Sequence, residues 1–336
     1  MNKNRDDYKP LELREGFFLD KYYENYQTMD SNANSSNWKY NCTYQLLPNA
    51  IAGHHQILHL TNMQVAYSRR EGGMMQDIHL ADETISIAVM EDCVDKVCFY
   101  RTKLKSGDII FFDGGRSFNL LTNNTMQFRI MTVKKSALGS LLPILTSALH
   151  KTIKDSDSLL SITLKETWEC FSSGISKDKK DFHDAQIKIF QVLQKLLKEQ
   201  TPTLQKLTKG EETALKIRKQ VYNHMDAKIN IQSLSKQHNI TEKTMQNSFK
   251  SLFGFTPNKF LRHMKLNLVY HDIKHSNPNK ITVQKIANRW GFLHMGHFNK
   301  YYTELFIENP SKTLIKNFNK DTIITNNCVN RQDEII

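Results

Sequence analysis

The sequence predicts an α+β protein in two parts, an N-terminal antiparallel β-barrel with flanking helices and a C-terminal all-α part. Three observations support this prediction. Short apolar runs separated by turn residues fill residues 55–133, with no helical periodicity between them. From about residue 136 the apolar spacing lengthens to that of helices. Residues 1–200 hold 25 Lys and Arg against 24 Asp and Glu, whereas residues 201–336 hold 21 against 10, so almost all of the +12 net charge lies at one end.

Length and composition are those of a soluble protein. A chain of 336 residues favours two domains, and 39% hydrophobic with 24% charged residues is ordinary for a globular protein. The longest apolar run, residues 138–149, is too short to span a bilayer, so no membrane association is expected. The polar N-terminus predicts no secretory signal. Five scattered cysteines argue against a disulfide framework and favour a cytoplasmic location.

The N-terminal half is expected to be mostly strands. The first forty residues are polar, and we expect little regular structure there beyond one short helix. From residue 55 short apolar runs are separated by GG, DE, SGD and NN. The runs are HQILHL, MQVAYSR, TISIAVME, KVCFYR, DIIFF, SFNLL and MQFRIMTV. KSGDIIFFDGGRSFNLL, residues 105–121, reads as turn, strand, turn and strand, a phrase common in cupin-like jelly rolls. The barrel is therefore predicted to be cupin-like.

A helix is predicted over residues 182–200, followed by a linker at 201–212 that contains Pro, Gly and Thr. One face of the helix carries an apolar stripe. The stripe packs either on the chain's own barrel or on its counterpart in a second chain, and the sequence leaves both alternatives open. The candidate dimerisation residues are Ile187, Phe190, Leu193 and Leu197.

The basic C-terminal part contains an internal repeat. At an offset of fifty-two, INIQSLSKQHNI (229–240) aligns with ITVQKIANRWGF (281–292), and Asn239 aligns with Gly291. Both residue types tolerate the left-handed backbone of a sharp turn. Past the turn the offset is fifty-three, and two buried stripes match: Met245, Phe249 and Leu252 with Phe298, Tyr302 and Leu305. Two helix-turn-helix units in tandem follow from this pattern.

The exits from the two units are also repeated, as SLFGFTPNKFL and ELFIENPSKTL. Gly254 suits a helix C-cap, and Thr256-Pro257 and Asn309-Pro310 suit helix starts. The helix predicted from Pro257 to Ile273 spans roughly 25 Å at ~1.5 Å per residue. Such a helix can hold two DNA-reading units about one turn of DNA, roughly 34 Å, apart.

Residues 217–314 resemble the DNA-binding domain of AraC/XylS-type transcription regulators, through LSKQHNIT…MQNSFKSLFGFTPNKFL and ITVQKIANRWGF…HFNKYYTELFIENPSKTL. Residues 44–73 and the following strands resemble, more loosely, the cupin-like sensory domain of some members. The segment HMGHF, residues 294–298, is most similar to the corresponding segment of ethanolamine-operon-type regulators. The resemblance implies a sensory and dimerisation domain at 1–200, a DNA-binding domain at 213–316 and a polar tail at 317–336. It implies a transcription activator whose partners are promoter DNA, RNA polymerase, a small-molecule effector and a second copy.

Some residues depart from the family pattern. Ser235 stands where Ala is usual, so its hydroxyl needs a backbone carbonyl as a partner. Lys265 and the pair Val269-Tyr270 replace an Arg and an Ala-Arg pair, so the ion pairs of the connecting helix should differ. Ile307 replaces the Gly that caps the second unit. Because a β-branched residue is poorly suited to positive φ, we expect that helix to end differently.

The face opposite each buried stripe is the candidate DNA-binding surface. Three amide side chains on it can pair with an adenine edge, and three lysines can contact guanine or phosphate. Two further basic residues, at the ends of the preceding helices, are expected to contact the DNA backbone and set the register. The candidate DNA-binding residues are Lys243, Gln246, Asn247, Lys250, Gly296, Asn299, Lys300 and Thr303, with Lys236 and Arg289 as backbone contacts.

The sequence indicates no catalytic residues, metal site or cofactor. His54, His55 and His59 lack the spacing of a metal-binding cupin, and phosphate-loop and G-x-S-x-G motifs are missing. Two alternatives stay open: a constitutive architectural DNA-binding protein whose barrel only dimerises, and a metal-dependent cupin enzyme fused to DNA-binding helices. A DNA-alkylation repair role would need Cys42 as a nucleophile, and no surrounding pattern supports it.

Overall fold

The computed structural model describes residues 10–24, 40–48, 51–93, 97–99, 102–115, 117–122, 124–174, 178–204, 206–223 and 231–316. They divide into two compact units. The first unit comprises Met1–Thr43, Ala50–Thr208 and Leu252–Gly254, and the second comprises Tyr44–Asn49, Lys209–Ser251 and Phe255–Ile336, each as far as it is described. In the described parts of the chain, no helix is both long and apolar enough to cross a membrane.

The first unit contains two β-sheets, of seven strands in the order β1-β3-β4-β11-β6-β9-β12 and of five in the order β2-β5-β10-β7-β8. The large sheet is antiparallel throughout, as are the described pairings of β5, β10, β7 and β8. This confirms the predicted antiparallel fold, which consists of two sheets instead of one closed barrel. The strands are β1 Phe18–Tyr23, β2 Tyr40–Gln45, β3 Ala52–His59, β4 Met63–Glu71, β5 Met74–His79, β6 Thr84–Cys93, β7 Val97–Phe99, β8 Thr102–Leu104, β9 Asp108–Asp113, β10 Ser117–Thr122, β11 Met126–Lys134 and β12 Thr152–Lys154.

The expectation of little regular structure before residue 40 was wrong for β1, which pairs along its whole length with β3. In its sequence, FLDKYY, Asp20 and Lys21 interrupt the apolar residues, and Phe18 and Tyr22 are exposed. An edge strand needs to bury only part of one face, so it lacks the apolar run by which the central strands were recognised.

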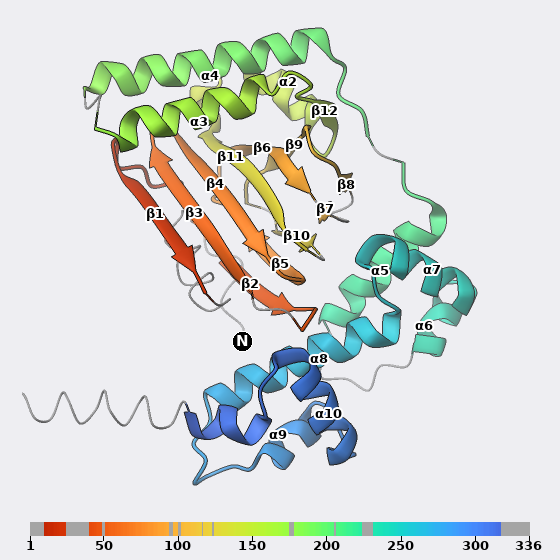
Figure 1. Cartoon of the computed structure of the whole chain (residues 1–336). Helices are drawn as coiled ribbons and strands as arrows, with labels where there is room; N and C mark the ends of the chain where they lie inside the picture. Colours follow the sequence, from red (N-terminus) through yellow and green to blue (C-terminus); the bar gives the residue numbers. More distant parts are fainter. Residues whose placement is uncertain are drawn as a thin grey trace, which may run out of the picture. The chain divides into compact units, whose positions relative to one another are not determined.

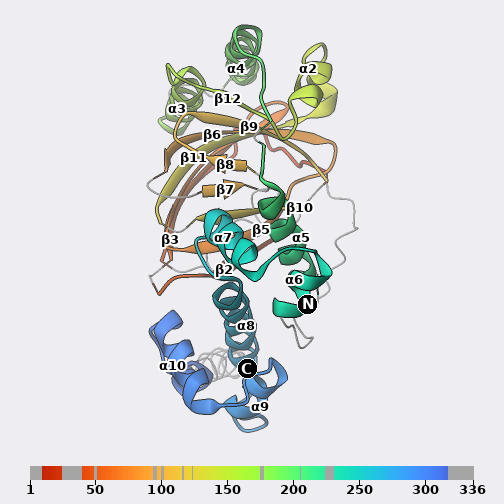
Figure 2. The ribbon, with the colours of Figure 1, turned by 90° about the vertical axis from the view of Figure 1, so that its right-hand side faces the viewer.

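The large sheet is buried on both faces. One core cluster combines residues of both sheets, among them Ile57, Phe112 and Leu120. A second cluster joins the opposite face of the large sheet to α2 (Leu141–Ala148), α3 (Leu159–Ser172) and α4 (Lys179–Glu199). These helices lie across that face (Figure 1, Figure 2). Burial on both sides explains why strands such as TISIAVM in β6 read as continuous apolar runs.

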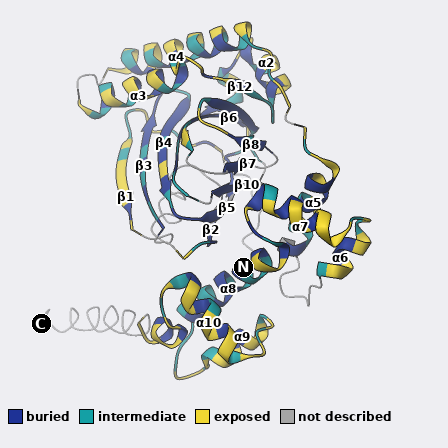
Figure 3. Ribbon diagram, turned by 45° about the vertical axis from the view of Figure 1, so that its right-hand side comes forward, coloured by how far each residue is buried: buried dark blue, intermediate teal, exposed yellow. Residues whose placement is uncertain are grey.

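Helix α4 packs on its own chain, and its inward side is buried while its outward side is exposed (Figure 3). Of the predicted stripe, Leu193 is fully buried in the core, and Phe190 and Leu197 pack against it from its margin. Ile187 is 40% exposed. The predicted stripe is therefore partly buried and partly exposed, because the buried residues of α4 follow a different line along the helix. That line consists of Phe182, Gln186, Ile189, Leu193 and Leu196.

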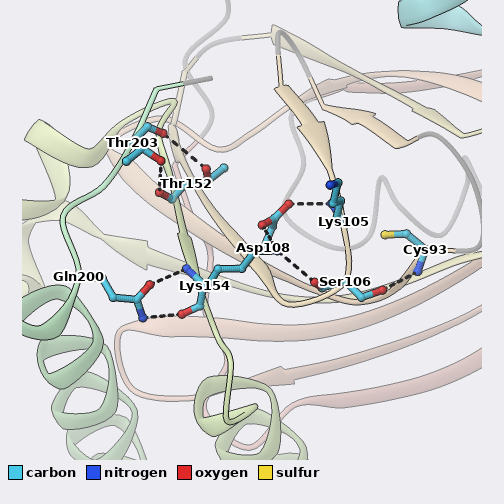
Figure 4. A network of polar contacts seen from close by, with 8 residues as sticks. All are labelled: Cys93, Lys105, Ser106, Asp108, Thr152, Lys154, Gln200 and Thr203. Carbon is cyan, nitrogen blue, oxygen red and sulfur yellow. Dashed lines mark hydrogen bonds and ion pairs between the residues drawn. The ribbon is translucent and has the colours of Figure 1, made fainter. Parts of the chain in front are cut away.

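A polar network fastens the chain to the sheet where α4 ends (Figure 4). The Gln200 side chain accepts a hydrogen bond from the Lys154 backbone amide at 2.8 Å and donates one to its carbonyl at 2.6 Å. Thr152 and Thr203 exchange backbone hydrogen bonds of 2.9 Å in both directions. The Lys154 ammonium lies 2.6 Å from an Asp108 carboxylate oxygen. The first residues of the predicted linker are therefore held against β12.

The second unit includes six helices in its described residues, apart from Leu252 and Phe253 at the end of α7. They are α5 (Lys209–Asn223), α6 (Ile231–Gln237), α7 (Glu242–Phe253), α8 (Pro257–Lys274), α9 (Val283–Arg289) and α10 (Met295–Phe306). Residues 310–316 are helical as well. One core cluster joins α8, α9 and α10 through Leu266, Val269, Ile286 and Phe298. This confirms the predicted all-α part with two helix-turn-helix units joined by a long helix, α8.

The sequence predicts one domain over residues 1–200, whereas the contacts assign Tyr44–Asn49 to the second unit. The reason is that its described residues Gln45 and Leu46 form hydrogen bonds with α8 and α10. Tyr44, Gln45 and Leu46 are 6%, 8% and 0% exposed, and Gln45 is hydrogen-bonded to Asn267.

Candidate nucleic-acid interface

The turn between the first pair of helices, α6 and α7, has the predicted geometry. Asn239 adopts φ 52°, in the left-handed region. The Ile240 amide donates to the Ser235 carbonyl at 3.1 Å. The Ser235 hydroxyl donates to the Gln232 carbonyl at 2.8 Å, which supplies the partner that this departure from the family pattern requires. The Thr241 hydroxyl then accepts the Thr244 amide at 3.1 Å and starts α7.

The turn between α9 and α10 repeats this geometry. Gly291 adopts φ 85°, and the Phe292 amide donates to the Ala287 carbonyl at 3.1 Å. The two residues of this bond stand fifty-two positions after Ile240 and Ser235, the offset of the sequence repeat. Thr282 caps α9 by accepting the Lys285 amide at 3.3 Å. The repeat in sequence is therefore a repeat in backbone hydrogen bonding.

Helices α7 and α10 bury the predicted faces. Every residue of the two matched stripes is no more than 2% exposed: Met245, Phe249, Leu252, Phe298, Tyr302 and Leu305. The opposite faces are exposed, and so are the C-terminal parts of α6 and α9. All ten candidate DNA-binding residues are exposed: Lys236, Lys243, Gln246, Asn247, Lys250, Arg289, Gly296, Asn299, Lys300 and Thr303. They are available to a ligand, and their contact with DNA stays a prediction.

Helix α8 begins as predicted. Gly254 adopts φ 75° after α7, and Thr256 accepts the Lys259 amide at 3.4 Å ahead of Pro257. The departure at residues 269 and 270 adds apolar surface to the second helix-turn-helix unit. Val269 is fully buried, and the Tyr270 ring lies 4.5 Å from that of Phe306.

The expectation that α10 ends differently because of Ile307 was wrong. Ile307 adopts φ 53°, in the left-handed region, and its amide donates to the Thr303 carbonyl at 2.9 Å. The helix therefore ends in the conformation that a Gly would adopt. The Ile307 side chain is 72% exposed, so nothing packed around it prevents this conformation, although the backbone remains unfavourable for a β-branched residue.

Two polar residues of α8 were missed. His263 and Asn267 are 8% and 7% exposed, and both bond to the segment 44–48. In the sequence they look like solvent-facing residues of an amphipathic helix. The only local signal is their spacing of four, which places them on one face of α8.

The histidines of the first unit serve different structural roles. His54 bonds to Asp20 and stacks on Tyr22, whereas His59 accepts the Arg14 amide at 3.1 Å and bonds to Gln64. Burial, with the nearby Arg70 guanidinium, lowers the pKa of His55 to about 3, so this imidazole stays neutral. Among the described residues, no three His, Cys, Asp or Glu side chains gather as a metal site would require.

The described cysteines form no disulfide. Cys93, Cys98 and Cys170 are free thiols, and burial raises the pKa of the Cys93 thiol to about 11, which keeps it protonated. The side chain of Cys42, the candidate considered for repair chemistry, lies outside the described residues.

Residues 234–315 match the family model of a helix-turn-helix domain. The probable thc operon regulatory protein of Rhodococcus erythropolis is 28% identical over 91 residues, which are 27% of this chain and 27% of that protein. The XylDLEGF operon transcriptional activator of Pseudomonas putida is 26% identical over 107 residues, 32% of this chain and 33% of that protein. This chain thus spans about a third or less of the length of these two relatives.

Among solved structures, the AraC-like transcriptional activator CuxR aligns with 76% of this chain and 95% of its own, at 9% identity and a TM-score of 0.44. At that identity and TM-score, the likeness has no bearing on function. The sequence matches confirm that the C-terminal part of the chain is a helix-turn-helix domain of the AraC/XylS type.

Proposed function

We propose that this protein is a sequence-specific DNA-binding transcription regulator that acts in the cytoplasm as an activator. The observation that carries the proposal is the repeated helix-turn-helix, whose two turns form equivalent hydrogen bonds. The segment that contains it also holds nearly all of the excess positive charge. A basic surface attracts the DNA phosphates, and two exposed polar helix faces provide the means to read bases.

In this proposal α7 and α10 are the reading helices, and each enters the major groove. Gln246 and Asn247 on α7 and Asn299 on α10 have the amide groups that can bond bidentately to adenine. Lys243, Lys250 and Lys300 supply guanine or phosphate contacts, with Gly296 and Thr303 completing the second face. Lys236 and Arg289 are exposed near the C-terminal ends of α6 and α9 and hold the phosphate backbone.

The first unit has the role of a sensor, a dimerisation domain or both, and it carries out no catalysis. The proposed partners are a small-molecule effector, a second copy of the chain and RNA polymerase. The exposed margin of α4 around Ile187, with the partly buried Phe190 and Leu197, is the remaining candidate for a dimer contact. Pairing two chains would raise the effective concentration of the second chain at a doubled DNA site.

The proposal is tested by selecting duplexes from a random pool with the full chain and measuring their affinity at several salt concentrations. The logarithm of the affinity should fall linearly with the logarithm of the salt concentration, with a slope of about −0.9 per phosphate contact. Absence of any salt-dependent duplex binding at ~50 mM salt would refute the proposal.

Variants of the selected complex separate base reading from backbone contact. Gln246→Ala should relax preference at particular base pairs by about 1–3 kcal/mol. Lys236→Ala should weaken binding to all DNA sequences alike and reduce the slope of log affinity against log salt concentration by about 1. Lys195→Ala, an exposed lysine of α4 in the first unit, is the matched control and should change neither quantity. Unchanged base preference in Gln246→Ala would show that the α7 face is assigned wrongly.

A further inference from the structure

Strand β2 ends in a segment that belongs structurally to the DNA-binding unit. The first residues of β2 lie in the first unit, where the Thr43 hydroxyl accepts a 2.9 Å hydrogen bond from the Gln76 side chain in β5. The next residues, Tyr44–Asn49, belong to the second unit, and the chain returns to the first unit at Ala50. We call the described residues Tyr44–Pro48 the strap.

The side chain of Asn267 holds the strap by its backbone. Its carbonyl oxygen accepts the Gln45 amide at 2.8 Å, and its amino group donates to the Gln45 carbonyl at 2.8 Å. A single side chain thus satisfies both backbone groups of one residue, as a neighbouring strand would. The Asn267 amino group also donates to the His263 carbonyl at 2.7 Å, which fixes its orientation on α8.

The side chain of Gln45 connects the strap to the end of the second reading helix. Its amide nitrogen donates to the Leu305 carbonyl at 2.7 Å. Leu305 lies in the last turn of α10, where carbonyls have no partner within the helix. Gln45 therefore bonds to α8 through its backbone and caps α10 through its side chain.

Leu46 is the second strap residue that bonds to α8. Its side chain is 0% exposed, and its carbonyl accepts a 2.7 Å hydrogen bond from His263 Nδ1. His263 and Asn267 are one helical turn apart on α8, so they present two polar groups to consecutive strap residues. Hydrogen bonds to the main chain are a common way in which proteins bind a short peptide, and here one asparagine and one histidine of α8 supply them.

We propose that the strap is a built-in peptide ligand of the DNA-binding unit, and that its docking holds α10 against α8 in the arrangement that reads DNA. Thr43 and Tyr44 are consecutive residues of one strand, so a displacement of β2 in the first unit passes along the backbone to the strap. A signal that favours the displaced strand releases the strap and weakens reading by α10, while α7 retains its contacts. The effect of the strap on DNA reading by α10 rests on the proposed function.

The docking is tested without DNA by hydrogen exchange of the full chain. Asn267→Ala removes both bonds to the Gln45 backbone, and amides of the peptide covering residues 44–48 should exchange at least about tenfold faster. Asn258→Ala, an exposed asparagine of the same helix, is the matched control and should leave exchange unchanged. Unchanged exchange in Asn267→Ala would overturn the docking.

The coupling is tested on a duplex selected by the full chain and on the same duplex with the α10 half-site scrambled. Scrambling should weaken binding of the unaltered protein, whereas Asn267→Ala should bind both duplexes equally, about tenfold more weakly than the unaltered protein binds the intact site. Gln45→Ala removes the side-chain bonds of Gln45 and leaves the helix sequences intact. It should show the same loss of half-site dependence, and it decides the test if Asn267→Ala fails to fold. Faster exchange with full half-site dependence in both variants would overturn the coupling. Failure of the unaltered protein to bind any duplex would refute the proposed function and, with it, the coupling, while the exchange result would still decide the docking.

Discussion

Replacing Leu193 by alanine is expected to lower the free energy of unfolding of the first unit by about 3–5 kcal/mol. The side chain is 0% exposed and lies in the core between α4 and the large sheet. Leucine-to-alanine changes at such sites cost this much because they remove buried apolar surface and leave a cavity. The matched control is Ile187→Ala on the same helix, where the side chain is 40% exposed. That change should cost less than about 1 kcal/mol.

The assay is a urea titration of the full chain, followed by pulsed hydrogen exchange on peptides from β6 and β9, which report on the first unit alone. Leu193→Ala should move the midpoint of these peptides to clearly lower urea, and Ile187→Ala should leave it almost unchanged. Equal shifts in the two variants would refute the assignment of the buried face of α4. Sedimentation of Ile187→Asp, which should stay folded, then determines whether the exposed margin of the helix supports a dimer.

Two further predictions concern the second unit. Burial lowers the pKa of His263 to about 4, with Lys259 and Arg262 adding to the effect against the hydrogen bond to Leu46, which raises it. The His263 imidazole therefore takes up a proton near pH 6.5 in the unfolded chain and only near pH 4 in the folded chain. Above pH 6.5 it should leave the free energy of unfolding constant. As the pH falls to 4, it should reduce that free energy by up to about 3 kcal/mol. Denaturant titrations across this range should show a flatter profile for His263→Gln, and an identical profile would contradict the reasoning. Ile307→Gly should raise the free energy of unfolding of the second unit by about 1 kcal/mol, and its thermal midpoint with it, because glycine adopts φ 53° without steric cost. A lowered midpoint would show that the Ile307 side chain stabilises the helix end.

The sequence by itself determined the elements whose signals are local. Asn239 and Gly291 occupy the left-handed turns predicted for them because few residue types tolerate that conformation. The stripes on α7 and α10 follow from helical periodicity, since burying one face requires apolar residues every three or four positions. The start of α8 follows from a cap and a proline at fixed spacing. All these signals lie within about two helical turns, so they are visible in the local sequence.

The tertiary structure decided what depends on distant residues. The face of α4 that is buried was set by the position of the large sheet, which buries Leu193 of the predicted stripe together with Ile189 and Leu196 from outside it. The role of Asn267 depends on Gln45, 222 positions earlier in the chain. No local periodicity distinguishes a polar side chain facing water from one facing a distant backbone. That difference arises only when folding brings the two segments together and removes the water between them.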